Sequence, residues 1–271
     1  MRKNIWLSLI ISILLTGTLL FTGCRAVLVA VDEEIEPGEL EKRQFNYDNF
    51  SKIDISSAFS YEIQKADNWS IAITAGSNLF EHIILTKSAQ ELDIDMNIPG
   101  GTIWTSGSYS RPKVIITMPE LTGLDSSGAT DGTVTGFSSD GNLDISLGGA
   151  FEIELSDIEA GRVIMDLSGA SKIIGYIQAD SIELEVSSAS RVRLEGSVND
   201  VILDAGGASR ADLSDLMARN VDATLREASS GIVNLDGKLN ANLSSASTLE
   251  YIGEPVIGDL DVTGASTFRK K

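Results

Sequence analysis

The sequence predicts an all-β protein, a right-handed single-stranded parallel β-helix (solenoid) of about eight coils. Three observations predict it: a short corner motif recurs about every 19 residues, a strand-like alternation precedes each copy, and a second strand-like run follows it. Two short strands in about 19 residues leave no room for the crossover helix of a βαβ unit. An antiparallel meander would fit a local segment, but it does not explain why one corner recurs with the same residue types.

The corner motif is a residue pair, usually small, followed by Ala and then usually by Ser or Thr. Its eight alanines are Ala129, Ala150, Ala170, Ala189, Ala208, Ala228, Ala246 and Ala265. The steps between them are 21, 20, 19, 19, 20, 18 and 19 residues, and Ser57-Ala58 resembles a degenerate earlier copy. Stacked coils bring like positions to about 4.8 Å, so we expect the alanines to form a buried inward ladder at a tight corner. Ser188 and Glu227 replace glycine in two copies, so a positive φ is favoured there but not obligatory.

The residues before each corner alternate in polarity. Positions three and five before the Ala are mostly apolar, as at Val186 and Leu184, and the residue between them is polar in every copy. These polar residues are Asp125, Ser146, Asp166, Glu185, Asp204, Thr224, Asn242 and Asp261. A period of two indicates a strand with one buried face. Connections between parallel strands are nearly always right-handed, which predicts a right-handed coil.

Residues 45–120 lead into the regular repeats of residues 121–268. Five strand-like runs occur there, at residues 53–55, 61–63, 71–73, 92–96 and 114–118. We expect a short helix near residues 79–85, and a Gly/Ser/Pro-rich loop at residues 97–112 that carries Trp104 and Tyr109. Residues 45–120 should supply N-terminal capping strands and the first coil of a β-helix domain that spans residues 45–271.

The N-terminus has the composition of a bacterial lipoprotein signal. Arg2 and Lys3 precede an apolar run that ends in Thr22-Gly23-Cys24, and small residues before a cysteine resemble a lipobox. We therefore expect a signal peptide at residues 1–23 and lipidation of Cys24, the only cysteine. The alternative is an uncleaved anchor helix with a chance cysteine; both alternatives export the rest of the chain. A lone cysteine excludes a disulfide framework.

The net charge limits the classes of partner that the protein can bind. Removal of Arg2 and Lys3 with the signal leaves 19 basic and 39 acidic side chains, a net charge of −20. Such a charge argues against nucleic acid or anionic lipid as a partner. Six acidic residues lie among residues 32–41 with little apolar material between them, so residues 24–44 should form an acidic tether.

Three segments together resemble the autotransporter-adhesin head GIN domain family. They are the corner LSGAS at residues 167–171, FNYDNFSKI at residues 45–53 and ITMPEL at residues 116–121. The resemblance covers about residues 45–268, nearly all of the exported chain. It implies an exported, often lipid-anchored β-helix, and it transfers no catalytic residues.

The sequence offers little catalytic chemistry. His82 is the only histidine, which makes a zinc site improbable, and we expect no metal and no cofactor. Polysaccharide cleavage is the enzymatic alternative, since Asp166, Glu185 and Asp204 should stack on adjacent coils at about 4.8 Å, near the carboxylate separation of a retaining glycosidase. Their regular ladder is explained more simply as a solvated acidic face.

A basic stripe departs from the regular pattern. Two positions after the Ala, three central coils carry Lys172, Arg191 and Arg210, and Arg193 follows on the same strand as Arg191. The stripe is either a salt-bridge ladder with the column of Asp166, Glu185 and Asp204, or a groove for an acidic glycan or peptide. Trp104 and Tyr109 either form a stacking platform for a sugar ring or cover the first coils.

These observations favour a non-catalytic cell-envelope surface lipoprotein, an adhesin-like module that binds a glycan or an envelope or cell-surface protein. It would be held by its N-terminal lipid to a bacterial membrane and face outward. The alternatives are an envelope scaffold or assembly subunit and, less favoured, a polysaccharide-active β-helix enzyme. The basic tail Arg269-Lys270-Lys271 should discourage end-to-end stacking into filaments at the C-terminal end.

Overall fold

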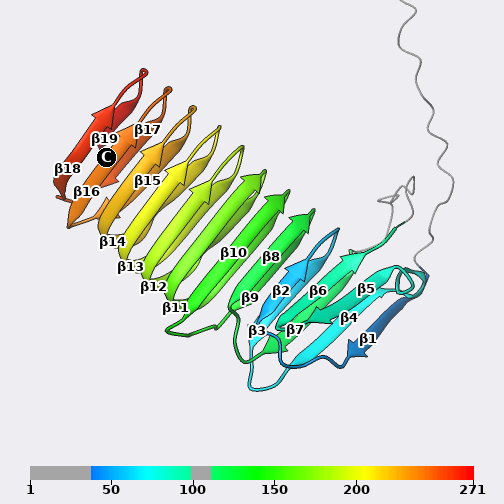
Figure 1. Cartoon of the computed structure of the whole chain (residues 1–271). Coiled ribbons are helices and arrows are strands. Elements are labelled where there is room, and N and C mark those ends of the chain that lie inside the picture. The colour runs from blue at the N-terminus through cyan, green and yellow to red at the C-terminus, as the bar shows by residue number, and fades with distance from the viewer. Residues whose placement is uncertain (1–37, 99–110) are drawn as a thin grey trace, which may run out of the picture. The chain divides into compact units, whose positions relative to one another are not determined.

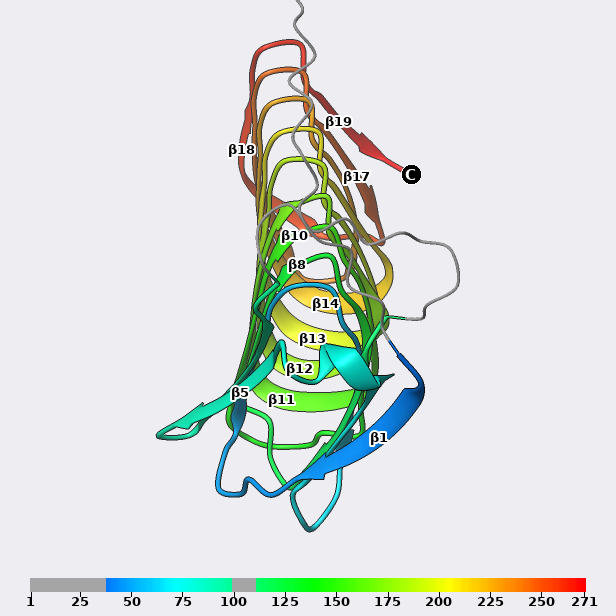
Figure 2. The same ribbon diagram turned by 90° about the vertical axis from the view of Figure 1, so that its right-hand side faces the viewer.

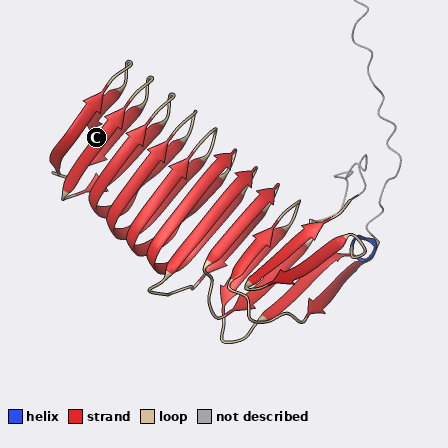
Figure 3. Ribbon diagram, viewed as in Figure 1, coloured by secondary structure: helices blue, strands red, loops and turns tan. Residues whose placement is uncertain are grey.

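A computed structural model describes residues 38–98 and 111–271, which belong to one compact unit (Figure 1). The signal peptide, Cys24, most of the tether and the segment with Trp104 and Tyr109 lie outside the described residues. The described chain is a β-solenoid of about seven turns of parallel stacked coils, with about 69% strand and about 1% helix (Figure 3). The predicted fold class is confirmed, with a similar number of coils. No helix among the described residues is long and apolar enough to cross a bilayer.

Each coil contributes strands to two faces of the solenoid. Face 1 holds the strands that run into the corner and the antiparallel strand β5. They pair in the order β5 (Ile83–Ser88), β6 (Glu91–Met96), β2 (Lys52–Ile55), β8 (Gly123–Gly128) and β10 (Asn142–Gly149), followed further along by β16 (Lys238–Leu243) and β18 (Val256–Val262). Face 2 holds the strands that leave the corner and the added strands β1 and β4. They pair in the order β1 (Leu40–Phe45), β4 (Ser70–Gly76), β7 (Lys113–Met118), β3 (Ser60–Lys65) and β9 (Asp131–Thr135), followed further along by β15 (Ser230–Leu235), β17 (Thr248–Ile252) and β19 (Thr267–Lys270).

Four long strands run through both faces in the middle of the solenoid. They are β11 (Glu152–Gly169), β12 (Lys172–Val186), β13 (Arg191–Ala205) and β14 (Arg210–Leu225). Each starts on face 2, bends, and ends on face 1, and all four pair in parallel with their neighbours. The bend forms a third, narrow side of the coil.

The core consists of ladders of apolar side chains between the faces. One ladder on face 1 joins residues in direct register, each at most 2% exposed: Val163, Ile182, Val201, Val221 and Leu239. The period-two pattern of the sequence places every second side chain of a strand in this interior. Burial of these stacked side chains is the main favourable contribution to stability.

The N-terminal end contains two coils where the sequence predicts one. Strands β2 and β3 stack directly on β8 and β9, and the coil of β6 and β7 lies on their other side, although it follows them in the chain. The chain therefore returns to build the outer coil before it joins the regular repeats. Ser57 has a φ of 71°, and a Cβ on Gly128 would lie 2.4 Å from the carbonyl oxygen of Ser57. Ser57 thus stacks on the first regular corner, as the degenerate copy predicts.

Antiparallel strands cap this end, and Figure 2 shows β1 and β5 there. The predicted helix at residues 79–85 is wrong: a 3₁₀ turn spans Ser77–Leu79, and the β-branched residues that follow form strand β5 against β6. The tether that we expected to reach residue 44 overlaps β1, which pairs with β4 from Leu40 onward. β5 and β6 form a hairpin of neighbouring strands, whereas the partner of β1 is about 30 residues away in the sequence, so a local pattern does not reveal it.

The orientation of the corner corrects a second prediction. The alanines, including Ala189 and Ala208, are exposed, and the next residue is buried in every copy but the last. The buried hydroxyl residues are Thr130, Ser171, Ser190, Ser209, Ser229 and Ser247. Alternation within the outgoing strand explains this result, because the basic stripe two residues after the Ala faces outward and the residue between must face inward. The residue before the Ala adopts left-handed backbone even where it is not glycine, with a φ of 63° at Ser188 and of 58° at Glu227.

Candidate ligand-binding face

The basic stripe is aligned as the repeat predicts. Lys172 pairs in register with Arg191, and Arg191 with Arg210, on three successive coils of face 2. Arg193 occupies the next outward position after Arg191 on β13. We call these four residues the basic patch; Arg191, Arg193 and Arg210 are exposed, and Lys172 is half-buried.

Two cations of the basic patch have carboxylate partners on their own face. Lys172 Nζ lies 2.6 Å from Glu152 Oε1, and Arg193 Nη2 lies 3.0 Å from Asp215 Oδ2. Arg191 and Arg210 make no ion pair with any carboxylate of the described residues. Arg191 and Arg210 therefore stand side by side as adjacent like charges.

The predicted salt-bridge ladder with the acidic column is wrong. Asp166, Glu185 and Asp204 are in register with one another on face 1, while the basic patch lies on face 2. The only described ion pair in that column joins Asp204 to Arg226, at 2.7 Å. The corner separates the two columns because the chain reverses there, so outward side chains before and after it point to opposite sides of the solenoid.

A hollow of about 570 Å³ adjoins the basic patch on face 2. It is lined by Glu154, Leu155, Ser156, Lys172, Ile174, Gly175, Tyr176, Arg193 and Glu195. Tyr176 is 42% exposed, and its hydroxyl accepts a hydrogen bond of 2.9 Å from Gln178 Nε2. A Cβ on Gly175 would lie 2.4 Å from the carbonyl oxygen of Leu155, so the close approach of these two strands requires glycine. The site thus combines an exposed aromatic ring with charged groups of both signs.

Sequence reasoning missed Tyr176. It chose Trp104 and Tyr109 as candidate aromatics because they lie in a Gly/Ser-rich loop, and both lie outside the described residues. The available signal was the repeat itself, because Tyr176 pairs in register with Glu195 and follows Lys172 and Ile174 on β12. Counting outward positions from the corner would have found a large aromatic at an exposed site.

A second hollow of about 300 Å³ continues along face 2 toward the N-terminal end, and Glu154 and Ile174 line both hollows. Lys113 Nζ and Glu62 Oε1 form an ion pair of 2.6 Å at its edge. A Cβ on Gly132 would lie 2.2 Å from the Tyr61 ring, so a glycine is required beside this buried tyrosine. The two hollows together offer an extended surface over several coils.

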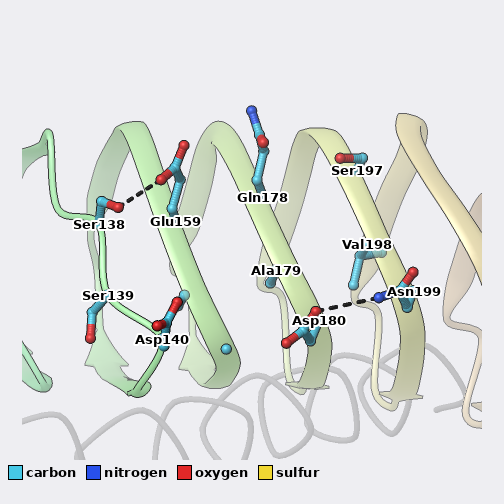
Figure 4. A pocket seen from close by; sticks show the side chains of 12 residues that line it. Ser138, Ser139, Asp140, Glu159, Gln178, Ala179, Asp180, Ser197, Val198 and Asn199 are labelled. Atoms are coloured by element: carbon cyan, nitrogen blue, oxygen red, sulfur yellow. Dashed lines mark hydrogen bonds between the residues drawn. The ribbon is translucent and has the colours of Figure 1, made fainter.

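A third hollow of about 460 Å³ follows the narrow side of the coils (Figure 4). Ser138 donates a hydrogen bond of 2.6 Å to Glu159 Oε2, and Asn199 donates one of 3.4 Å to Asp180 Oδ1. Neither an aromatic ring nor a basic side chain is among its lining residues. It offers hydrogen bonds to a neutral ligand, and its carboxylates would repel an anion.

The residues considered for catalysis lie away from the hollows of face 2. Asp166, Glu185 and Asp204 belong to the regular outward column of face 1. His82 lies between the 3₁₀ turn and β5, with Nε2 3.7 Å from Glu81 Oε1. Neither group lines the hollows of face 2.

The acidic column is most crowded at the N-terminal end of face 1. Asp54 is in register with Asp93 on one side and with Asp125 on the other. Burial, followed by the charges of these two carboxylates, raises the pKa of Asp54 to about 6. Because this pKa lies above the unfolded value, ionisation of Asp54 destabilises the fold as pH rises from about 4 to 6.

Replacing Asp54 with Asn should therefore stabilise the protein at neutral and higher pH. Since Asp54 remains partly solvated, we expect a gain of about 1 kcal/mol at pH 8 after screening by solvent. The gain should vanish below about pH 4, where the aspartate is protonated in both states. Chemical denaturation at both pH values measures the difference; an equal effect at pH 4 and pH 8 would show that the charge of Asp54 is not its cause.

Comparison with solved structures supports the fold. Three solved structures share the fold, and each superposes on 88% of this chain. One is a putative lipid binding protein from Parabacteroides distasonis, with 19% identity, a TM-score of 0.75 and 100% of its own chain covered. The others are a putative adhesin from the same species (14% identity, TM-score 0.77, 100% of its chain covered) and a putative adhesin from Parabacteroides merdae (15% identity, TM-score 0.78, 99% of its chain covered). Among curated proteins, none matches the sequence.

The family comparison covers most of the solenoid. Residues 49–255 match the family described as "putative auto-transporter adhesin, head GIN domain". This range includes all four residues of the basic patch and both hollows of face 2. The chain therefore belongs to the head GIN domain family of auto-transporter-adhesin-like proteins, as its corner motifs predict.

Proposed function

We propose that this protein is an exported, lipid-anchored, non-catalytic surface adhesin that binds an anionic glycan through the basic patch and the adjoining hollow of face 2. The observation that carries the proposal is the pair Arg191 and Arg210. They are aligned on adjacent coils and form no ion pair with a carboxylate of the described residues, although Arg210 attracts the nearby Asp212 electrostatically. They lie beside a hollow that contains an exposed tyrosine.

The chemistry of these groups suits a sugar acid. A guanidinium group binds a carboxylate or sulfate through two parallel hydrogen bonds. Two such groups about 4.8 Å apart can contact one acidic group together or two successive groups of a polymer. The ring of Tyr176 offers an apolar surface with a polar tip, on which a sugar ring can stack. Glu154 and Glu195 can accept hydrogen bonds from sugar hydroxyls.

Stability gives a weak reason for the arrangement. Exposed ion pairs contribute about 0–1 kcal/mol, and like charges on adjacent strands are unfavourable. Other coils carry Ser230 or Thr248 at the same position, so the fold does not require a cation there. A bound anion would offset the repulsion between Arg191 and Arg210.

The double variant Arg191→Ser and Arg210→Ser tests this site. We expect it to lose at least about tenfold in affinity for an acidic polysaccharide at low salt, because two charge-assisted contacts are removed. The remaining affinity should depend less on salt than that of the unmodified protein. The melting temperature should change little, since both side chains are exposed.

A matched control uses face 1. The variant Arg162→Ser and Arg226→Ser changes the net charge equally, and these arginines are also exposed and pair with Glu183 and Asp204. It should keep normal affinity. If both double variants lose affinity equally, binding reflects net charge, and the basic patch is not the site. Normal binding by the face 2 variant places the site elsewhere.

Lipidation of Cys24 is tested separately. The charged start, the apolar run and the sequence Thr22-Gly23-Cys24 support cleavage before Cys24 and its acylation. Replacing Cys24 with Ser should leave the precursor unprocessed or release the protein from the membrane fraction. Mass spectrometry of the N-terminus and fractionation measure this; unchanged processing and unchanged partitioning would show that Cys24 is not the anchor.

A further inference from the structure

Most of the carboxylates that line the hollows of face 2 are compensated by a cation. The lining carboxylates of the two hollows are Glu62, Asp131, Glu152, Glu154 and Glu195. Four of them form ion pairs within the described residues: Glu62 with Lys113, Asp131 with Arg111, Glu152 with Lys172, and Glu195 with Arg193. Glu154 is exposed, and its carboxylate forms neither an ion pair nor a hydrogen bond with any described residue. It is therefore the uncompensated negative charge of this lining.

Arg191 and Arg210 are the uncompensated positive charges of the same face. Register relates them to Glu154, because Glu154 on β11 pairs with Ile174 on β12, which pairs with Arg193 on β13. Arg191 lies one outward position before Arg193. With coils about 4.8 Å apart and about 3.3 Å per residue along a strand, the Cα atoms of Glu154 and Arg191 lie about 12 Å apart. The two charges form no ion pair with each other, so both remain available to a ligand.

The surface between these charges can accept a sugar ring. Ile174 is half-buried and Tyr176 is 42% exposed, and both line the larger hollow of face 2 together with Glu154. Lys172 also lines this hollow, but its Nζ lies 2.6 Å from Glu152 Oε1, so its charge is compensated. A ligand that spans the hollow therefore meets a carboxylate at one end, apolar and aromatic surface in the middle, and guanidinium groups at the other end.

We propose that the glycan of this site is zwitterionic, with an acidic group that binds Arg191 and Arg210 and a protonated amino group that binds Glu154. This inference rests on the proposed function, since it names the class of acidic glycan that the same site takes. An ammonium group offers three hydrogen-bond donors and forms charge-assisted hydrogen bonds with a carboxylate. The ring of Tyr176 in the same hollow also attracts a cation. Two linked sugar rings, one with the acid and the other with the amine, can span the distance between the two ends.

A purely anionic polymer fits this surface less well. Its first acidic groups would bind Arg191 and Arg210, but its next ones along face 2 would reach Glu154, where no cation compensates the carboxylate. Like charges at close range repel each other. A polymer in which amines alternate with acids replaces this repulsion with attraction.

The fold does not require a carboxylate at residue 154. The positions in register on the neighbouring coils are Thr133 and Ile174, and Arg193 occupies the same column one coil further on. The carboxylate of Glu154 has no partner that would stabilise the fold, and it adds to the repulsion within a strongly acidic chain. A cationic group of the ligand would offset that repulsion.

Hyaluronan oligosaccharides provide a matched pair of probes. The natural form carries one carboxylate per disaccharide, and the form without N-acetyl groups carries one carboxylate and one amine. The full-length chain, purified in detergent, is titrated with each form at low salt by isothermal titration calorimetry. We expect the amine form to bind about fivefold more tightly, because one exposed ion pair is gained.

Variants at residue 154 test the cause of this preference. Glu154→Gln should abolish the preference, and Glu154→Lys should reverse it, because a cation there repels the amine. Arg193 in the same column shows that the fold accepts a cation at such a position, and melting temperatures establish that each variant folds. The control is Glu185→Gln, which removes the same charge from an exposed glutamate of face 1 and should keep the preference.

The outcomes separate this inference from the proposed function. The variant with Arg191→Ser and Arg210→Ser should weaken the binding of both forms; if it binds both normally, the proposed function fails. Equal affinity of the unmodified chain for the two forms, or a preference that Glu154→Gln retains in full, overturns the zwitterionic ligand and leaves the basic patch as an anion site. Absence of binding to either form overturns both.

Discussion

Replacing Gly169 with Ala is expected to lower the free energy of unfolding by about 3 kcal/mol. Gly169 sits in the corner motif with a φ of +80°, and a Cβ there would lie 2.4 Å from the carbonyl oxygen of Gly149 on the preceding coil. The clash is with backbone of a paired strand, so it cannot be relieved by rotation of a side chain. Denaturant unfolding measures the loss.

Gly206 provides the matched control in a later corner. It has no positive φ, and a Cβ there would meet nothing within 4 Å. Gly206→Ala should therefore be neutral or slightly stabilising, because it restricts the unfolded chain. If the two variants lose equal stability, the corners do not stack as described.

Replacing Leu203 with Ala should cost about 2–5 kcal/mol. Leu203 is fully buried, between Leu184 and Ala223 in register on the neighbouring coils. Truncation leaves a cavity that neighbouring coils cannot fill without breaking their own register. The adjacent residue Ile202 is 51% exposed, so Ile202→Ala should change stability by less than about 1 kcal/mol. A larger loss at Ile202 than at Leu203 would invert the assignment of the inward face.

The sequence predicts the strands well because they depend on local, repeated patterns. Alternation around Leu184 and Val186 identifies the buried face, and even spacing of the alanines identifies the register. The alignment of Lys172, Arg191 and Arg210 follows from that spacing alone, and the structure confirms it.

The corner and the N-terminal end are less accessible to such reasoning. Ser188 has a positive φ, and the expectation that Ala189 faces inward follows from the small size of the recurring alanines and not from a count of alternating positions. Counting backward from Arg191 gives the correct answer. The order of the first coils cannot be read locally, because β6 and β7 follow β2 and β3 in the chain but stack outside them.

In the candidate site, too, some features follow from local sequence patterns and others do not. Its cations can be identified from their position in the repeat, but their carboxylate partners cannot. Lys172 pairs with Glu152 of the preceding coil, and Asp166 lies across the corner on the other face. Tyr176 gains its significance only when the hollow around it is seen. Sequence periodicity gives neighbours along a column, whereas a binding surface also depends on neighbours across strands.

A glycan array probed with the chain from Gly38 to Lys271 tests the central claim most directly. The account predicts binding to glycans that carry carboxylate or sulfate groups, weakening as salt is raised, and little binding to neutral glycans of the same backbone. Binding of this kind should be lost in the variant with Arg191→Ser and Arg210→Ser. Selective binding to neutral glycans, or acidic binding that this variant retains in full, would contradict the assignment of the basic patch as the ligand-binding site.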